Sequence, residues 1–387
     1  MPIGYLVTVV LAGCFALFAL SPIRGHGPLG VLSYYFGLVF NEIPFVVIYW
    51  LMGAALIAEA QDDLRTPLGW TSFGLSVLVV LGYLVVAWRA LPAREQVRRS
   101  LVEGLGADWR AELPADWASR LRERRPWARI LLWPFPFRGR KVERLANIPY
   151  GPDGWRNTLD VYRRPGGETG RPVLVYLHGG RFVSGRKNRE ARPILHRLAR
   201  QGWVCVSANY RLSPEAVFPD HLVDLKRVIA WARQHGHEYG ADASTLFVAG
   251  SSAGGHLAAF AGLTPNEPVY QPDFESVDTS VTGVISLYGW YGNVNGGERV
   301  PSSPFDQLRP DAPPFFVTHG DLDPLVLVEG AREFVGELRR VSDNVVVYAE
   351  LSGAHHSYDL FHSLRCEAVV DGVEAFVNWA RAREAAR

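Results

Sequence analysis

A glycine-rich hexapeptide, Gly250-Ser251-Ser252-Ala253-Gly254-Gly255, most constrains how this chain can fold. An apolar, β-like run precedes it at Thr245–Ala249, and a helix-like run follows at His256–Ala261. A strand that turns directly into a helix must fold back very tightly. Glycines two residues before and two residues after the turn residue make this sterically possible. The pattern G-x-S-x-G therefore predicts a strand–turn–helix unit that holds Ser252 in a strained conformation with its hydroxyl exposed.

From residue 141 onward the sequence alternates between short β-like runs and helix-like runs. The strands are expected at Val142–Tyr150, Thr158–Tyr162, Pro172–Leu177, Val204–Asn209, Thr245–Ala249, Val281–Tyr288, Pro314–Thr318 and Val345–Leu351. The helices are expected at Glu190–Gln201, Pro219–His235, Gly254–Gly262, Val328–Arg340 and Leu360–Arg387. Such alternation is typical of an α/β fold with a mostly parallel sheet, here of eight expected strands, flanked by helices. Functional groups in such folds gather at the carboxyl ends of the strands.

One of these expected strand ends carries His178-Gly179-Gly180. Acyl transfer builds negative charge on the substrate oxygen, so N–H donors must already point at that position. Gly179 and Gly180 allow the backbone to approach closely, and the N–H of Ala253 would supply a matching donor from the serine turn. We therefore expect Gly179, Gly180 and Ala253 to form an oxyanion hole.

Acidic and histidine residues follow the last two expected strands. The run His319–Val326 contains Asp321 and Asp323, and a later loop contains His355 and His356. A nucleophilic serine needs a base to take its proton, and the base needs an acid to fix its tautomer. Serine, aspartate and histidine in this order at strand ends make a triad the expected arrangement. Among the other histidines, His256 is expected to pack, and His221, His235 and His237 are expected to lie in solvent.

Together these motifs resemble the serine carboxylesterases of the hormone-sensitive-lipase-like branch of the α/β-hydrolases. Asn209–Pro214, Phe218-Pro219 and Asp224 also match motifs of that branch. The resemblance covers residues 142–387, extends to membrane-bound actinobacterial esterases and isoprenylcysteine methylesterases, and implies an α/β-hydrolase fold.

The resemblance also implies roles for single residues. The D-P-L pattern favours Asp323 over Asp321 as the acid, and the G-A-x-H pattern favours His356 over His355 as the base. The implied triad is therefore Ser252, Asp323 and His356, and it requires no cofactor and no metal. Arg181 departs from the branch, which has a small residue there, so we expect it to border the substrate pocket.

Residues 1–91 are nearly all apolar and read as a transmembrane region. Ile3–Ser21 and Ser72–Trp88 each approach the roughly twenty residues that a helix needs to cross a bilayer. Leu29–Ala60 is too long for one simple span. Either Asn41 caps a second span from Glu42 to Ala60, after an interfacial segment, or one long kinked helix places Glu42 inside the bilayer. A secretory signal peptide is not expected, because Met1–Pro22 contains no Lys or Arg.

The charges between the spans predict the orientation. The loop after the second span carries Asp62 and Asp63 against Arg65, whereas the flank of the third span is basic at Arg89, Arg94, Arg98 and Arg99. Because positive flanks stay in the cytoplasm, we expect about three spans and a cytoplasmic catalytic domain from residue 141 to 387. Residues 92–140 form an Arg- and Trp-rich connector, which suits either an anionic bilayer surface or an amphipathic cap on that domain.

The sequence thus predicts a membrane-anchored serine ester hydrolase for a small-molecule or lipid ester, with the lipid bilayer as a partner. The net charge of +1 and the lack of a basic–aromatic motif argue against nucleic acid. Two alternatives remain open: an acyltransferase that passes the acyl group to a lipid alcohol, and a catalytically silent binding protein. We also expect a truncated chain that begins near Leu91 to fold and to hydrolyse soluble esters.

Overall fold

The computed structural model describes residues 2–386, apart from 26, 123, 138, 140, 167 and 295–299. Its centre is one eight-stranded sheet with the strand order β1-β2-β4-β3-β5-β6-β7-β8. Strand β2 is antiparallel to both of its neighbours, and the other neighbouring pairs are parallel. The expected α/β-hydrolase architecture is confirmed.

The bounds of the elements follow the sequence pattern closely. The strands are β1 Glu143–Pro149, β2 Thr158–Arg163, β3 Arg171–Leu177, β4 Val204–Ala208, β5 Ala241–Ser251, β6 Gly283–Leu287, β7 Phe315–Gly320 and β8 Val346–Leu351. The helices of the N-terminal part are α1 Pro2–Leu20, α2 Pro28–Phe40, α3 Pro44–Ala60, α4 Pro67–Ala90, α5 Ala93–Leu105, α6 Ala115–Arg120 and α7 Trp127–Leu132. Those of the hydrolase part are α8 Arg192–Arg200, α9 Asp220–His235, α10 Ala253–Leu263, α11 Val328–Val341 and α12 Leu364–Ala385. Short 3-10 turns lie at Asp63–Arg65, Trp109–Glu112, Gly154–Asn157, Gly236–Tyr239, Pro268–Tyr270 and Pro304–Gln307.

Every expected strand and helix of the hydrolase part is present, with ends that shift by a few residues. The largest shifts are at β5, which begins at Ala241 rather than Thr245, and at α12, which begins at Leu364 rather than Leu360. The expected end of that last helix, Arg387, lies outside the described residues. Strand ends are hard to place from sequence because pairing with neighbouring strands extends them beyond their apolar run.

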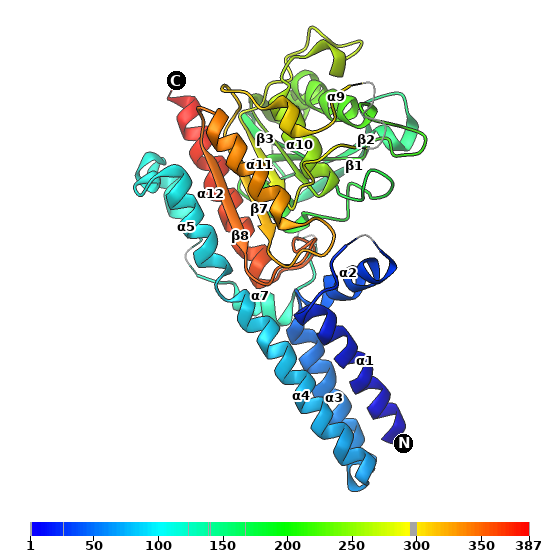
Figure 1. Cartoon of the computed structure of the whole chain (residues 1–387). Helices are drawn as coiled ribbons and strands as arrows, with labels where there is room; N and C mark the ends of the chain where they lie inside the picture. Colours follow the sequence, from blue (N-terminus) through cyan, green and yellow to red (C-terminus); the bar gives the residue numbers. More distant parts are fainter. Residues whose placement is uncertain are drawn as a thin grey trace.

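Helices cover both faces of the sheet. On one face α9, α10 and α11 pack through residues such as Leu222, Leu257 and Phe334. On the other face α8 and α12 pack together with α5, whose Val97 and Leu101 are buried. Helix α5 therefore belongs to the hydrolase core, although the sequence left open whether the connector lies on a membrane or on the domain. Figure 1 shows α5 running beside α12 and β8.

Helices α1, α3 and α4 form a stem below the hydrolase part, and α2 lies at the upper end of this stem (Figure 1). Helices α1 and α4 contain stretches that are long and apolar enough to cross a membrane, at Ile3–Leu20 and from Pro67 onward. Helices α2 and α3 form a pair bent by 79°, which makes up to three spans within the described residues if the pair counts as one.

The bend between α2 and α3 falls within the segment, residues 29–60, for which the sequence left two arrangements open. Pro44 begins α3, as expected for a new helix, but the residue before it is Ile43 and no side chain caps the helix. Asn41 instead donates from Nδ2 to the carbonyl oxygen of Gly353, 3.0 Å away in the hydrolase part. Glu42 pairs with Arg365 of α12, with 3.1 Å between Oε1 and Nη1. Residues 29–60 therefore form two helices with a sharp bend between them, and the expected Asn41 cap is wrong.

Candidate active site

The serine turn lies at the carboxyl end of the central strand β5. Ser252 stands between β5 and α10 with φ 55° and ψ −116°, a strained backbone conformation for a residue with a side chain. An added Cβ at Gly250 would overlap the carbonyl oxygen of Gly254, so the turn tolerates no larger residue there. The N–H of Ser252 donates to the carbonyl oxygen of Leu287 at 2.9 Å, which ties the turn to β6. The G-x-S-x-G spacing therefore has the local consequence that the sequence predicted.

The structure brings Asp323 and His356 together at the same edge of the sheet. Strands β7 and β8 are paired with Gly320 opposite Leu351, so the loops that follow them start side by side. The Nδ1 atom of His356 lies 2.6 Å from Oδ2 of Asp323. This leaves Nε2 as the ring nitrogen that can accept a proton from an incoming hydroxyl.

The surroundings of Asp323 favour its ionised form. Burial alone would raise the pKa of this fully enclosed carboxyl, but the net shift is downward because His356 and His319 lie against it. Backbone N–H groups of Leu325 and Val326 donate to Oδ1, each at 2.9 Å. His319, to which the sequence assigned no role, places Nε2 3.4 Å from Oδ2. The surroundings therefore keep Asp323 ionised, so that it can accept a hydrogen bond from Nδ1 of His356.

The competing residues Asp321 and His355 point elsewhere. Asp321 accepts the N–H of Gly353 at 2.7 Å, within the wall between the two loops. The Nε2 of His355 lies 3.1 Å from the carbonyl oxygen of Ala19 at the end of α1. Burial lowers the pKa of His355 to about 3, so its ring stays neutral. Both residues face the N-terminal helices rather than Ser252.

The loop after β3 places only part of the expected oxyanion hole. Gly180 has φ 121°, which only glycine adopts readily, and Ala253 opens α10 beside Ser252. The N–H of Gly179, however, donates to Oε2 of the buried Glu190 at 2.6 Å. Within the described part of the chain, the N–H groups of Gly180 and Ala253 donate to no other backbone group. The expectation for Gly179 must therefore be revised, because a buried carboxylate that the sequence did not reveal takes its donor.

The motif Asn209–Pro214, which follows β4, packs against the loop after β3. The Tyr210 hydroxyl donates to the carbonyl oxygen of His178 at 3.0 Å, and the two rings stack 4.5 Å apart. The next residue, Arg211, forms an ion pair with the buried Asp224, with 2.9 Å between Nη2 and Oδ1. Tyr210 therefore packs directly against the loop after β3, whereas Arg211 is bound to α9 through Asp224.

A cavity of about 340 Å³ opens at this edge of the sheet. Four of the predicted residues line it, namely Arg181, Ser252, Ala253 and His356. The other walls are mostly apolar and are made by Phe182, Val183, Trp290, Val294, Leu325 and Val326, with Ser213 and Asn293. An apolar cavity with a few converging polar groups is typical of a small-molecule site.

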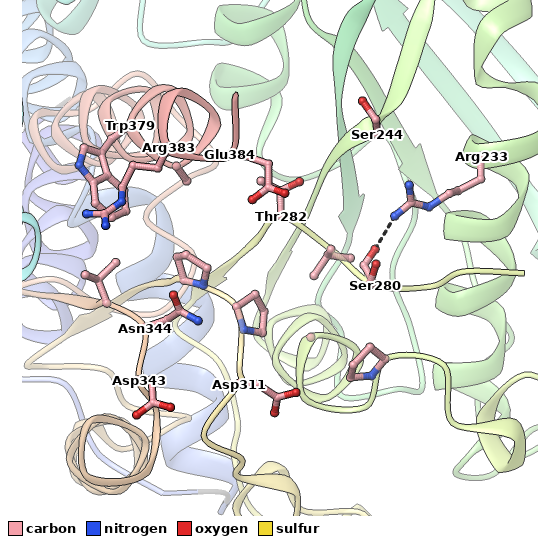
Figure 2. A pocket seen from close by; sticks show the side chains of 17 residues that line it. Arg233, Ser244, Ser280, Thr282, Asp311, Asp343, Asn344, Trp379, Arg383 and Glu384 are labelled. Atoms are coloured by element: carbon pink, nitrogen blue, oxygen red, sulfur yellow. Dashed lines mark hydrogen bonds between the residues drawn. The ribbon is translucent and has the colours of Figure 1, made fainter. Parts of the chain in front are cut away.

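A second hollow, of about 320 Å³, lies at the opposite edge of the sheet (Figure 2). Its walls carry charged residues, among them Arg383 and Glu384 of α12 and Asp343. Arg233 is already used there, since it donates to the carbonyl oxygen of Ser280 at 2.9 Å. None of the predicted site residues lies in this hollow, so we place the site at the cavity beside Ser252.

Comparison with known proteins agrees with this geometry. The BD-FAE family model matches residues 159–296. The protein named probable carboxylic ester hydrolase LipM, from Mycobacterium tuberculosis, is 36% identical over 407 aligned residues, which cover 97% of this chain and 93% of LipM. The chain belongs to this esterase family of the α/β-hydrolases.

Two further matches describe how far the similarity extends. Esterase LipQ of the same organism is 34% identical and covers 84% of this chain and 90% of LipQ. Among solved structures, the apo form of Thermogutta terrifontis esterase 2 has a TM-score of 0.52 at 25% identity and covers 62% of this chain and 94% of that one. The chain is therefore a carboxylesterase-type hydrolase, and a catalytically silent binding protein is not supported.

A buried carboxyl pair behind the oxyanion loop of this esterase was not foreseen. Asp359 accepts the hydroxyl of Ser251 at 3.0 Å and also bonds the hydroxyl of Tyr288. Glu190 is equally buried, and no cation lies within ion-pair distance of either carboxyl among the described residues. Burial, together with the neighbouring Asp359, raises the pKa of Glu190 to about 7. The only signal in the sequence was an acidic residue at the start of an expected helix.

This carboxyl predicts how the stability of the esterase depends on pH. The ordinary pKa of a glutamate is 4.5, whereas folded Glu190 releases its proton at about 7. Between these pH values the folded state holds a proton that the unfolded state lacks, so raising the pH lowers the free energy of unfolding. We expect Glu190→Gln to weaken this dependence, as measured by thermal unfolding of the full chain between pH 5 and 8. Glu103→Gln, an exposed change on α5, should leave the dependence unaltered. A Glu190→Gln protein with the parental dependence would contradict the prediction.

Proposed function

We propose that this esterase is membrane-anchored and cleaves carboxylic esters through a Ser252–His356–Asp323 triad and a covalent acyl-enzyme. The observation that carries the proposal is the 2.6 Å contact between Asp323 and His356, at the mouth of the same cavity that Ser252 lines. The membrane anchor is supported by the apolar helices α1 and α4.

The proposed reaction follows from these positions. Ser252 Oγ attacks the ester carbonyl carbon while Nε2 of His356 takes the hydroxyl proton, and Asp323 stabilises the resulting imidazolium. The N–H groups of Gly180 and Ala253 bind the oxyanion, and each such donor is typically worth about 3–4 kcal/mol of barrier. His356 then gives its proton to the leaving alcohol. A water molecule, activated by the same histidine, releases the acid and restores Ser252.

A fluorophosphonate probe tests the proposal directly. It should label the full-length protein at Ser252 and at no other serine, as located by peptide mass spectrometry. Absence of labelling in an otherwise active enzyme would overturn the triad. Product analysis with and without a lipid alcohol then distinguishes hydrolysis from acyl transfer, since both use the same acyl-enzyme.

Arg181 is proposed to shape the substrate cavity. It lines the cavity at φ 57°, a left-handed conformation that glycine adopts without strain. Arg181→Gly should therefore fold normally, while the ratio of long-chain to short-chain p-nitrophenyl ester activity changes by about tenfold. Arg186→Ala removes an exposed arginine of the same loop that does not line the cavity and serves as the control. An unchanged profile for Arg181→Gly would mean that this side chain extends into solvent.

We further propose that the hydrolase part faces the cytoplasm. Arg89 and Arg94 follow the last span, whereas Asp62 and Asp63 lie at the opposite end of the stem. Positive flanks resist translocation. Reporter fusions after residue 61 and at the C-terminus should report outside and inside, respectively. The reverse result would overturn the orientation and leave the proposed chemistry intact.

A further inference from the structure

Both loops that carry the proposed acid and base are held by residues from the membrane region. The acid loop contacts the link between α1 and α2. Arg24 donates from Nη2 to the carbonyl oxygen of Asp321 at 3.1 Å, and the N–H of Gly25 donates to the carbonyl oxygen of Pro324 at 2.9 Å. Hydrogen bonds from the α1–α2 link therefore hold the backbone before and after Asp323.

Helix α2 packs closely against the loop after β8, which carries His355 and His356. An added Cβ at Gly37 would lie only 2.7 Å from Nδ1 of His355, closer than side chains tolerate. At the end of α2, Asn41 donates to the carbonyl oxygen of Gly353 at 3.0 Å. The position of α2 therefore limits where the backbone that precedes His356 can lie.

Tyr34 of α2 contacts the base itself. Its ring meets the ring of His356 edge-on, with 5.8 Å between the centroids and an interplanar angle of 72°. Its hydroxyl lies 3.2 Å from Oγ of Ser357, the residue that follows the base. Ser357 has φ 64°, a left-handed conformation that a serine adopts only when its surroundings enforce it. Tyr288 contacts the His356 ring as well, at 4.6 Å, so the ring is held by two tyrosines and Asp323.

The outer face of α2 is apolar and uncovered. Leu29, Leu32 and Tyr35 are 62%, 42% and 59% exposed, and their spacing places them in one stripe along the helix. The inner face carries Tyr34 and Gly37. Because short links join α2 to α1 and α3, this stripe lies at the end of the helical stem nearest the hydrolase part (Figure 1). An apolar helix face at that level suits a bilayer surface.

We propose that Tyr34 is a positioning residue for His356, and that α2 completes the active site only when its outer face rests on the bilayer surface. The inference builds on the proposed triad and adds a partner that regulates it. The Tyr34 hydroxyl fixes Ser357, and the ring limits rotation of the imidazole, so that Nε2 stays aimed at Ser252. Membrane contact thereby becomes a condition for full activity rather than a means of localisation alone.

A double-mutant cycle on the full chain in phosphatidylglycerol–phosphatidylcholine vesicles tests the first part. Tyr34→Phe and Ser357→Ala should each lower kcat for p-nitrophenyl butyrate about tenfold with little change in KM, since a small misplacement of a catalytic group has effects of this order. The double variant should be no worse than either single variant, because both remove the same contact. Tyr49→Phe, a matched change at an exposed tyrosine of α3 that plays no part in the proposal, should retain the parental kcat. Additive losses, or a Tyr34→Phe protein with the parental kcat, would overturn the role of Tyr34.

Labelling by a fluorophosphonate separates this inference from the proposed function. The parental protein should be labelled at Ser252, and Tyr34→Phe should be labelled about tenfold more slowly. No labelling of the parental protein would overturn the triad, whereas equal rates would overturn only the role of Tyr34. For the bilayer, Leu32→Glu should lower the labelling rate in vesicles by a similar factor, with no further loss when Tyr34→Phe is added. A Leu32→Glu protein labelled at the parental rate would mean that the bilayer surface does not seat α2.

Discussion

Ser252→Ala should abolish nearly all esterase activity, with a loss on the order of 10⁴-fold or more in kcat. The hydroxyl of Ser252 lies at the tip of the strained turn and lines the cavity. The fold should survive, because the backbone bonds of the turn do not involve the hydroxyl. The measurement is the steady-state rate with p-nitrophenyl butyrate, together with a thermal unfolding curve that confirms folding.

Ser251→Ala is the matched control for this change. Its hydroxyl is buried, accepts from Tyr176 at 2.9 Å and donates to Asp359 at 3.0 Å. Its loss should cost about 1–3 kcal/mol of stability, because buried polar partners are left unpaired, while activity should stay within about tenfold of the parent. Equal losses of activity at the two serines would contradict the assignment of the nucleophile.

The second large effect is expected at the acid–base pair. His356→Ala should be about as damaging as the serine change, and Asp323→Asn should lower kcat by about 10³–10⁴-fold, because an amide no longer selects the correct histidine tautomer. The short contact between the two side chains, 2.6 Å, is the basis of this expectation. Measuring kcat and KM separately shows whether the loss lies in chemistry or in binding.

Asp321→Asn is the appropriate control at the neighbouring carboxyl. Asp321 binds the N–H of Gly353, an acceptor role that an amide oxygen can keep. We therefore expect a change in kcat of less than about tenfold. If Asp321→Asn proved as damaging as Asp323→Asn, the proposed acid would have to be reassigned.

Local patterns predicted the framework of the site well. The G-x-S-x-G turn and the residues after β3, β7 and β8 lie at one edge of the sheet because parallel strands of similar length end together. The 2.6 Å contact of Asp323 with His356 agrees with the D-P-L pattern, which favoured Asp323 over Asp321. Motif and strand register are local properties, and local properties are what a sequence displays most directly.

Features that depend on distant packing were not predicted. His221, expected in solvent, is buried beneath Phe182, with 5.1 Å between the ring centroids. Glu190 takes the N–H of Gly179 only because the chain after β3 folds back over the oxyanion loop. Most importantly, the expectation that the hydrolase part needs nothing from residues 1–91 overlooked the contacts of Tyr34 and Glu42. No periodicity reveals such contacts, because the partners are more than 300 residues apart.

The ion pair between Glu42 and Arg365 means that the N-terminal helices of this esterase cannot simply be replaced by those of another protein. Both side chains are enclosed at 1% exposure, and Ser363 donates to the same carboxylate at 2.5 Å. A chimera that kept the hydrolase but took α1 to α4 from an unrelated protein would leave the buried guanidinium of Arg365 without its partner, at a cost of about 3–5 kcal/mol. The N-terminal helices and the hydrolase must therefore change together, so that a substitution at the corner of α2 and α3 is compatible only with a matching one at the start of α12.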